Sequence, residues 1–256
     1  MICQSFPSMG MSVQFSPFQK DLLCLATSDN FGIVGNSKLY VLKLNFNDNS
    51  VFPVKVFPIQ DALFQIAFSE QNPKLVSCVT GNGFFKLYNI DSNNPLIDLK
   101  IHNKEVNSVS CNHKLPFLYL TAGIDRKINI IDVNKQKVDL ISNQAHSAPI
   151  NQVTWHPKMQ NIFASCGKDG KVMLFDLLKS GSNKHSIGAI DAKDVLCMDF
   201  NKYNDTFITG STDNTIKLYD IRKTKIPLFV YQGHRYGVKS VKFSPFKQNI
   251  FISSSL

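Results

Sequence analysis

A step of about 44 residues recurs along this chain and constrains its fold more than any other feature. Aspartates mark the step twice in each copy. One series closes short apolar segments and consists of Asp132, Asp176 and Asp220, with Asn89 in the same place one copy earlier. A second series lies in turn-like segments and consists of Asp125, Asp169 and Asp213, with Asn82 in the earlier place. Recurrence of this kind predicts structural anchors, because a catalytic group is needed only once.

Two further series of polar residues keep the same step. Hydroxyl residues occupy the first, at Thr121, Ser165, Thr209 and Ser253. Histidines occupy the second, at His102, His146 and His234, and the missing member falls near Asp191. We expect each histidine to satisfy buried polar partners in its own repeat rather than to bind metal or act as a base.

Each repeat contains four short runs rich in Val, Ile, Phe and Tyr, separated by polar turn signals. No stretch shows convincing helical periodicity. Four short strands in a repeat of about 40–45 residues are typical of a β-propeller blade. The sequence therefore predicts an all-β fold, with one β-propeller domain over 1–256 and blades starting near 12, 62, 105, 149, 194 and 237.

The sixth repeat reaches only its second strand, in the segment FISSSL. Five blades and the start of a sixth would form an incomplete ring of a seven-bladed propeller, and such a ring exposes a sheet edge. We therefore expect a C-terminally truncated product that lacks roughly two blades. Such a product should be less stable than a complete ring.

Composition narrows the possible classes of protein. Hydrophobic residues make up 43% and charged residues 18%, as in globular domains. The six cysteines show no CxxC pair or zinc spacing, which predicts buried free thiols in a reducing compartment, with no metal and no cofactor. No signal peptide and no apolar run long enough for a membrane helix is present, so a cytosolic chain without a membrane span is expected. The net charge of +9 is attributed to scattered lysines, and no nucleic-acid partner is expected.

The order of histidine, hydroxyl residue, aspartate and aromatic residue resembles the hydrogen-bond tetrad of the WD-repeat family. In the fourth repeat these positions hold His146, Ser165, Asp169 and Phe175, and in the fifth repeat the aromatic place holds Tyr219. The resemblance implies that the histidine links the hydroxyl to the aspartate. The tryptophan typical of the family is absent, because its place is taken by Tyr88, Ile131, Phe175 and Tyr219.

Three segments resemble a narrower group, the type-2 peroxisomal targeting signal receptors of the peroxin-7 family. They are residues 15–42 with the stretch FGIVG, residues 61–70 (DALFQIAFSE) and residues 233–246 (GHRYGVKSVKFSPF), and residues 203–222 agree with them. The resemblance implies a non-catalytic receptor that binds cargo proteins through a nine-residue N-terminal signal. That signal consists of Arg or Lys, an aliphatic residue, five variable residues, His or Gln, and an aliphatic residue. A peroxisomal import co-receptor and shuttling between cytoplasm and peroxisome are also implied.

The turns before the first strands form the candidate peptide site. Three residues after each histidine position lie Glu105, Pro149, Asp194 and Gly237, and a step of 44 back from Glu105 gives Asp61. Acidic side chains there would suit a cationic peptide, because charge-assisted hydrogen bonds orient an arginine. Nearby, Leu63, Phe64 and Tyr236 are expected to contact the apolar face of the peptide.

Three other interpretations stay open from the sequence. A WD-repeat scaffold subunit of a chromatin or RNA-processing complex would have the same fold and would explain the positive charge. An enzyme is disfavoured, because the sequence has no nucleophile with a placed base and no Gly-rich phosphate loop. The acidic turn residues are otherwise ordinary solvated side chains, and Leu63 and Phe64 ordinary core residues.

Overall fold

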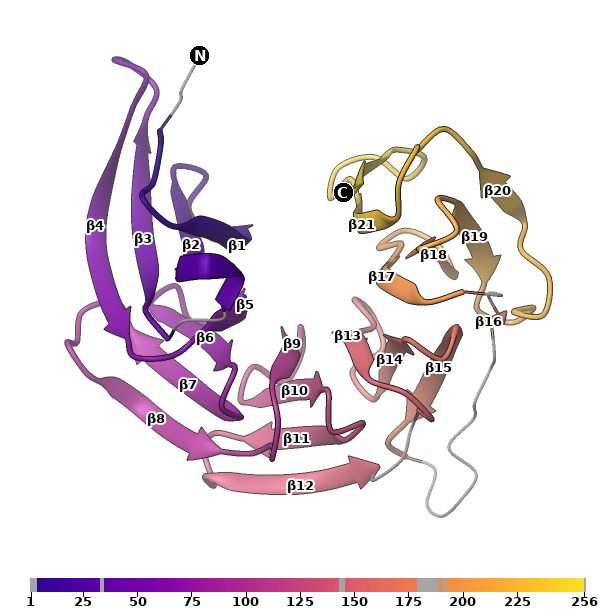
Figure 1. Ribbon diagram of the computed structural model, residues 1–256, viewed down its shortest axis with the longest axis horizontal. Helices are drawn as coiled ribbons and strands as arrows, with labels where there is room; N and C mark the ends of the chain where they lie inside the picture. The colour runs from indigo at the N-terminus through magenta and orange to yellow at the C-terminus, as the bar shows by residue number, and fades with distance from the viewer. Residues whose placement is uncertain (1–3, 33–34, 143–145, 179–188, 191–192, 256) are drawn as a thin grey trace. The chain divides into compact units, whose positions relative to one another are not determined.

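The structure is a computed structural model that describes residues 4–32, 35–142, 146–178, 189–190 and 193–255. Its described residues form antiparallel sheets, each built from strands consecutive in the sequence (Figure 1). We call these sheets blades 1 to 6, as in a WD-repeat β-propeller. Five blades have four strands and blade 6 has two, as predicted. The one described helical segment is a 3-10 turn, η1 (Asp29–Gly32).

Contacts group the chain into two compact units, which are described separately. Unit 1 comprises residues 1–112, 116–121 and 129–139, and unit 2 comprises residues 113–115, 122–128 and 140–256. The boundary runs through blade 3. The expectation of a single domain over 1–256 therefore stays a prediction.

Blades 1 and 2 lie within unit 1. Blade 1 consists of β1 (Met9–Phe15), β2 (Leu22–Ser28), β3 (Ser37–Asn45) and β4 (Ser50–Ile59). Blade 2 consists of β5 (Leu63–Phe68), β6 (Leu75–Thr80), β7 (Phe84–Asn89) and β8 (Pro95–Lys100). Blade 3 follows with β9 (Val106–Cys111), β10 (Leu118–Gly123), β11 (Ile128–Asp132) and β12 (Lys137–Ser142).

Blades 4 to 6 lie within unit 2. Blade 4 consists of β13 (Ile150–Trp155), β14 (Ile162–Gly167), β15 (Lys171–Asp176) and β16 (Ala189–Ile190). Blade 5 consists of β17 (Val195–Phe200), β18 (Thr206–Ser211), β19 (Ile216–Asp220) and β20 (Phe229–Tyr231). Blade 6 pairs β21 (Val238–Phe243) with β22 (Phe251–Ser255).

Apolar clusters between successive blades form the core. In unit 1, one cluster joins blades 1 and 2 and another joins blade 2 to β9, β10 and β11. In unit 2, the clusters join blades 4 and 5 and then blades 5 and 6. Second strands such as β14 are therefore buried almost throughout, because they are covered on both faces. The cysteines at 24, 78, 111, 166 and 197 are free and buried in these layers, as predicted, whereas Cys3 lies outside the described residues.

Two features repeat in the first strands and link neighbouring blades. A bulge interrupts the pairing after the first strand residue, for example between Leu63 and Gln65 and between Ile150 and Gln152. Side-chain oxygens then accept hydrogen bonds from the backbone of the following blade. The Gln65 side chain accepts from the Val109 N–H at 2.7 Å, and Gln152 accepts from the Met198 N–H at 2.9 Å.

Candidate functional site

Each antiparallel blade has two ends, and the candidate site belongs to one of them. The turn before the first strand and the turn between the second and third strands lie at the same end, which we call the slot end. The turns between first and second strands lie at the other end, the cap end. All candidate peptide-binding residues are in or beside slot-end turns.

Blade 4 builds its slot end around a buried histidine. His146 Nδ1 lies 2.8 Å from Asp169 Oδ1, and its Nε2 lies 2.7 Å from Ser165 Oγ. Burial lowers the pKa of His146, although the hydrogen bond and charge of Asp169 raise it. The ring is therefore neutral at pH 7, so that Nδ1–H donates to Asp169 and Nε2 accepts from the Ser165 hydroxyl.

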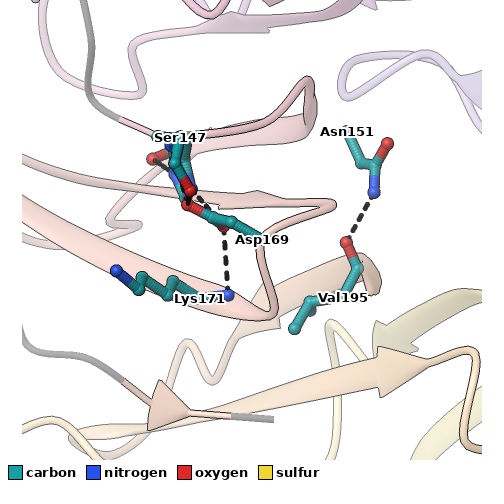
Figure 2. Close-up of polar contacts among 7 residues, drawn as sticks. Ser147, Asn151, Asp169, Lys171 and Val195 are labelled. Atoms are coloured by element: carbon teal, nitrogen blue, oxygen red, sulfur yellow. Dashed lines mark hydrogen bonds and ion pairs between the residues drawn. The ribbon is translucent and has the colours of Figure 1, made fainter. Parts of the chain in front are cut away.

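Asp169 extends this network to the backbone, as Figure 2 shows. Its carboxylate accepts from the N–H groups of Ser147 at 3.1 Å and Lys171 at 3.2 Å. Burial raises the pKa of Asp169, but the hydrogen bonds from His146 and from these N–H groups outweigh burial and lower it. Asn151, in the bulge of β13, donates to the Val195 carbonyl of blade 5 at 2.8 Å (Figure 2). These bonds hold the slot end of blade 4 in one conformation.

Two other repeats show histidine and hydroxyl contacts of the same kind. His102 contacts the Thr121 hydroxyl at 3.0 Å and the Asn129 amide at 3.3 Å. His234 contacts the Ser253 hydroxyl at 2.8 Å. The Asp125 carboxylate accepts from the Lys127 N–H at 3.1 Å.

Blade 5 lacks the histidine. Asp191, at the histidine position, lies outside the described residues, and the Thr209 hydroxyl is buried without a hydrogen-bond partner in the part that is described. The Asp213 carboxylate instead accepts hydrogen bonds from the Thr215 N–H and from Lys217 Nζ, the latter at 3.0 Å.

The aromatic positions of blades 4 and 5 pack without a tryptophan. Phe175 stacks on Phe163, and Tyr219 stacks on Phe207.

Blade 2 replaces the buried polar network by apolar contacts. Ile59 and His146 each lie four residues before the first strand of their blade, and Cys78 and Ser165 each pair with the fourth residue of that strand. The side chains of Ile59 and Cys78 are buried in the cluster that joins blades 1 and 2. The turn after β6 is held by Asp61, whose Oδ2 accepts from the Asn82 N–H at 2.7 Å, and by the Thr80 hydroxyl, which donates to Asn82 Oδ1 and accepts from the Phe84 N–H.

The pairing also changes the register of the candidate site. The residue directly before each first strand accepts a hydrogen bond from the turn after the second strand: Ala62 from Gly81, Pro149 from Lys168, and Asp194 from Thr212. Ala62, not Asp61, is therefore the counterpart of Pro149 and Asp194. The step from blade 2 to blade 3 is 43 residues, since Leu63 corresponds to Val106, so the step of 44 used for Asp61 was one residue too long.

Of the two apolar candidates in unit 1, only one is accessible. Leu63 is fully buried in the core, and its backbone is bonded to Ser28 and Ser37 of blade 1. A ligand cannot reach this side chain, so we leave Leu63 out of the proposed site. Phe64 is the bulge residue of β5 and is partly exposed. A side chain added at Gly81 would contact both Phe64 and Asp61 at 3.4 Å, so these two residues line the same turn.

Glu105 lies beside this turn at the slot end of unit 1. The Gly83 carbonyl accepts from the N–H groups of Ile101 and His102 at 2.9 and 3.1 Å. Gly83 has a φ of +96°, and an added Cβ would lie 2.1 Å from the His102 carbonyl, so only glycine fits there. The hydrogen bonds to Gly83 hold residues 101–102 against the turn after β6, which Asp61 also contacts, and Glu105 follows three residues later. The Glu105 side chain is partly buried, and its carboxylate has no ion pair or hydrogen bond within the described part of the chain.

The remaining candidates belong to unit 2. The Asp194 carbonyl accepts from the Thr212 N–H at 3.0 Å, whereas its carboxylate has no partner among the described residues. Tyr236 precedes β21 and is 65% exposed. Each unit thus presents an acidic and an aromatic candidate at its slot end. Groups of three or more His, Cys, Asp or Glu able to hold a metal are absent from the described residues.

The sequence did not predict the structural role of His156, which lies at the cap end. In five blades the first residue of the turn there accepts hydrogen bonds from the backbone two or three residues later, and in blade 4 this residue is His156. Its Nδ1 accepts from the N–H groups of Lys158 and Met159 at 3.1 and 3.0 Å. The same place holds Ser16, Ser69, Asn201 and Ser244. The recurrence of Ser and Asn at this place could have predicted the turn in blade 4, but histidine is not usual at such a turn.

Comparisons with known proteins agree with the repeat structure. The family described as WD domain, G-beta repeat matches residues 138–176, 183–220 and 225–256. A peroxisomal targeting signal 2 receptor of Saccharomyces cerevisiae is 27% identical over 96% of this chain and 78% of that protein.

Two further relatives match over shorter regions. A peroxisomal targeting signal 2 receptor of Dictyostelium discoideum is 34% identical over 47% of this chain and 39% of its own length. The peroxisome biogenesis protein 7 of Arabidopsis thaliana is 32% identical over 48% of this chain and 40% of its own length. Among the described residues, no helix is both long and apolar enough to cross a membrane.

Proposed function

Because this chain is a WD-repeat protein, similar over 96% of its length to a peroxisomal targeting signal 2 receptor, we propose that it is a receptor for that signal. In this proposal it binds the N-terminal type-2 signal of cargo proteins in the cytoplasm and carries them to the peroxisome. The chain-long similarity carries the proposal, since a propeller alone hosts many functions.

The slot end supplies the side chains that such a signal needs. The signal resembles a short cationic peptide with aliphatic residues near both ends. Glu105 offers a partly buried carboxylate without a partner among the described residues. A carboxylate in such a setting forms stronger charge-assisted hydrogen bonds than one in open water. We propose Glu105 as the main contact for the basic residue of the signal in unit 1.

Asp61 and Phe64 would assist Glu105. Asp61 uses Oδ2 for the Asn82 N–H, which leaves Oδ1 for a ligand. Phe64 lines the same turn and is partly exposed, so it can cover an aliphatic side chain of the peptide. Asp194 and Tyr236 are proposed as the corresponding acidic and aromatic contacts in unit 2. A peroxisomal import co-receptor and a cytoplasmic and peroxisomal location belong to the same proposal.

A peptide titration tests both the function and the site. Fluorescence anisotropy would compare a labelled peptide carrying a type-2 signal with a scrambled peptide of the same composition. We expect Glu105→Gln to weaken binding about tenfold, as for loss of a charge-assisted hydrogen bond. Asp61→Asn should have a smaller effect, since asparagine still accepts from the Asn82 N–H. Asp91→Asn is the control, because Asp91 is exposed and pairs with Lys74 at the cap end of unit 1.

The outcomes separate the function from its site. Equal affinity for the signal and the scrambled peptide would refute the receptor function. Specific binding that neither Glu105→Gln nor Asp61→Asn alters would refute the site alone. Binding to nucleic acid that collapses as salt rises, without specific peptide binding, would favour the scaffold alternative.

A further inference from the structure

The cap end of unit 2 carries a row of linked basic turns. The turn after β13 is tied to the turn after β17, because Lys158 Nζ donates to the Tyr203 carbonyl at 3.1 Å. The turn after β17 is tied to the turn after β21, because Lys202 Nζ and the Tyr203 hydroxyl donate to the Pro245 carbonyl at 3.2 and 2.7 Å. The three turns therefore form one continuous surface within unit 2.

The positive charge of this row is not neutralised by its own contacts. Lys158 and Lys202 bond to backbone carbonyls, which carry no net charge, and Lys247 has no ion pair among the described residues. All three lysines are exposed. The turn after β19 adds Arg222, Lys223 and Lys225 at the same end. The acidic residues of this end are Asp176, Asp199, Asp205 and Asp220, of which Asp199 is paired with Lys242 and Asp220 with Arg222.

The charge of the whole chain is uneven in the same direction. Residues 140–256 contain 15 Lys and Arg against 8 Asp and Glu, whereas residues 1–139 contain 13 against 11. The excess of positive charge is therefore 7 in residues 140–256 and 2 in residues 1–139. In unit 1 the cap-end turns are balanced, since Lys20 is followed by Asp21, and Lys74 pairs with Asp91.

Exposed aromatic side chains stand among the lysines of this row. Phe246 is 84% exposed and precedes Lys247, while Tyr203 is 39% exposed and lies 5.9 Å from Lys202 Nζ. Exposed aromatic groups surrounded by basic side chains suit the boundary between the lipid headgroups and the acyl chains of a membrane.

We propose that this surface, defined by Lys158, Lys202, Tyr203, Phe246 and Lys247, binds an anionic phospholipid bilayer. The lysines attract the negatively charged headgroups, and the two aromatic rings enter the headgroup layer. Binding is peripheral and reversible, because only a few side chains take part. A soluble acidic protein would use the lysines but would leave Phe246 in water unless it also offered an apolar pocket. The proposal does not depend on the receptor function and uses the opposite end of the blades.

Vesicle sedimentation of the full chain tests this proposal. The probes are vesicles of phosphatidylcholine alone and vesicles that also contain phosphatidylserine. We expect partitioning onto the anionic vesicles only, weakened by salt. Lys247→Gln should weaken it about fivefold and Lys158→Gln with Lys202→Gln about 25-fold, at about fivefold per basic residue. Phe246→Ala should also weaken it, and more at high salt, where the apolar contribution remains.

Matched variants separate lipid binding from folding and from net charge. Lys158 and Lys202 also link the turns, so their variants are checked by thermal unfolding, whereas no side-chain bond of Lys247 or Phe246 within the described residues would be lost. The control is Lys168→Gln with Lys193→Gln, which removes the same charge from the slot end and should change partitioning less than about twofold.

Three results would overturn the proposal. The first is no partitioning onto anionic vesicles at low salt. The second is an equal loss in the control variant, which would mean binding by net charge. The third is tight binding of polyglutamate without vesicle partitioning, which would assign the surface to an acidic protein partner instead.

Discussion

Blade 4 and blade 2 hold the turn between their second and third strands with different side chains. In blade 4 a buried histidine joins the Ser165 hydroxyl to the Asp169 carboxylate, and the carboxylate holds the turn. In blade 2 the equivalent interior contains Ile59 and Cys78, and the turn is held by the Thr80 hydroxyl and by the more exposed Asp61. A buried polar network stabilises the fold only if each of its polar groups has a hydrogen-bond partner. An apolar pair contains no polar side-chain group that needs one.

The difference also decides which side chains remain for a ligand. The carboxylate of Asp169 is used entirely within blade 4, by a histidine and two backbone N–H groups. Blade 2 moves its carboxylate outward to Asp61, which uses one oxygen for the turn. Departure from the repeat pattern in blade 2 thus coincides with a more accessible acidic group at the slot end of unit 1.

The largest effect is expected from removing the histidine of blade 4. His146→Ile should lower the free energy of unfolding by about 3 kcal/mol, because it leaves the Ser165 hydroxyl and the Asp169 carboxylate buried without this partner. Trp155, the one tryptophan of the chain, is buried in blade 4 and reports its unfolding by fluorescence in a urea titration.

A triple variant distinguishes loss of the network from loss of packing. His146→Ile with Ser165→Cys and Asp169→Asn gives the three network positions of blade 4 the residues of blade 2 and removes the buried hydroxyl and carboxylate, so it should recover part of the stability. If the triple variant is as unstable as His146→Ile alone, the residues of blade 2 cannot replace the polar network of blade 4.

A smaller effect is expected from the reverse change in blade 2. Cys78→Ser should cost about 2 kcal/mol, because it places a hydroxyl without a partner in an apolar cluster. Burial raises the pKa of Cys78 to about 12, so the native thiol stays protonated and behaves as a small apolar group. Circular dichroism during urea unfolding measures the loss.

A double-mutant cycle then sharpens the comparison. Ile59→His with Cys78→Ser creates a histidine and hydroxyl pair like that of blade 4, so the double variant should be more stable than the sum of the single losses. Strict additivity would show that the two positions do not contact each other, although both belong to the same apolar cluster.

The sequence predicted the blades better than the candidate site. Four series of polar residues at one step marked blades 3 and 4 in full and blades 2, 5 and 6 in part. Blade 2 has neither the histidine nor the hydroxyl. Although Asn82 and Asn89 lie 43 residues before Asp125 and Asp132, a step of 44 was applied from Glu105, which gave Asp61, one residue away from the true register. The bonds from Gln65 and Gln152 to the next blade were also missed, since they join residues about one repeat apart.

His156 offers the smallest effect and separates the two ends of blade 4. Burial lowers the pKa of His156 to about 4, and its Nδ1 accepts two backbone N–H groups, so the folded state holds the neutral ring. The unfolded histidine titrates near its usual pKa of about 6.5. Between these two values the unfolded state binds a proton that the folded state does not. Stability is therefore complete above about pH 6.5 and falls as the pH drops toward 4.

His156→Asn tests this origin of the pH dependence with a residue that the chain itself uses at the same place. Asn201 caps the equivalent turn of blade 5 through its Oδ1. The variant should lose some stability at pH 7, because the ring of His156 packs 4.9 Å from that of Phe200. It should also lose the part of the pH dependence between pH 7 and 5, on the order of 1 kcal/mol, that the histidine causes. Urea titrations at both pH values measure the change, and an unaltered difference between them would assign the acid sensitivity to other groups, with His146 at the slot end as the first to examine, because burial lowers its pKa as well.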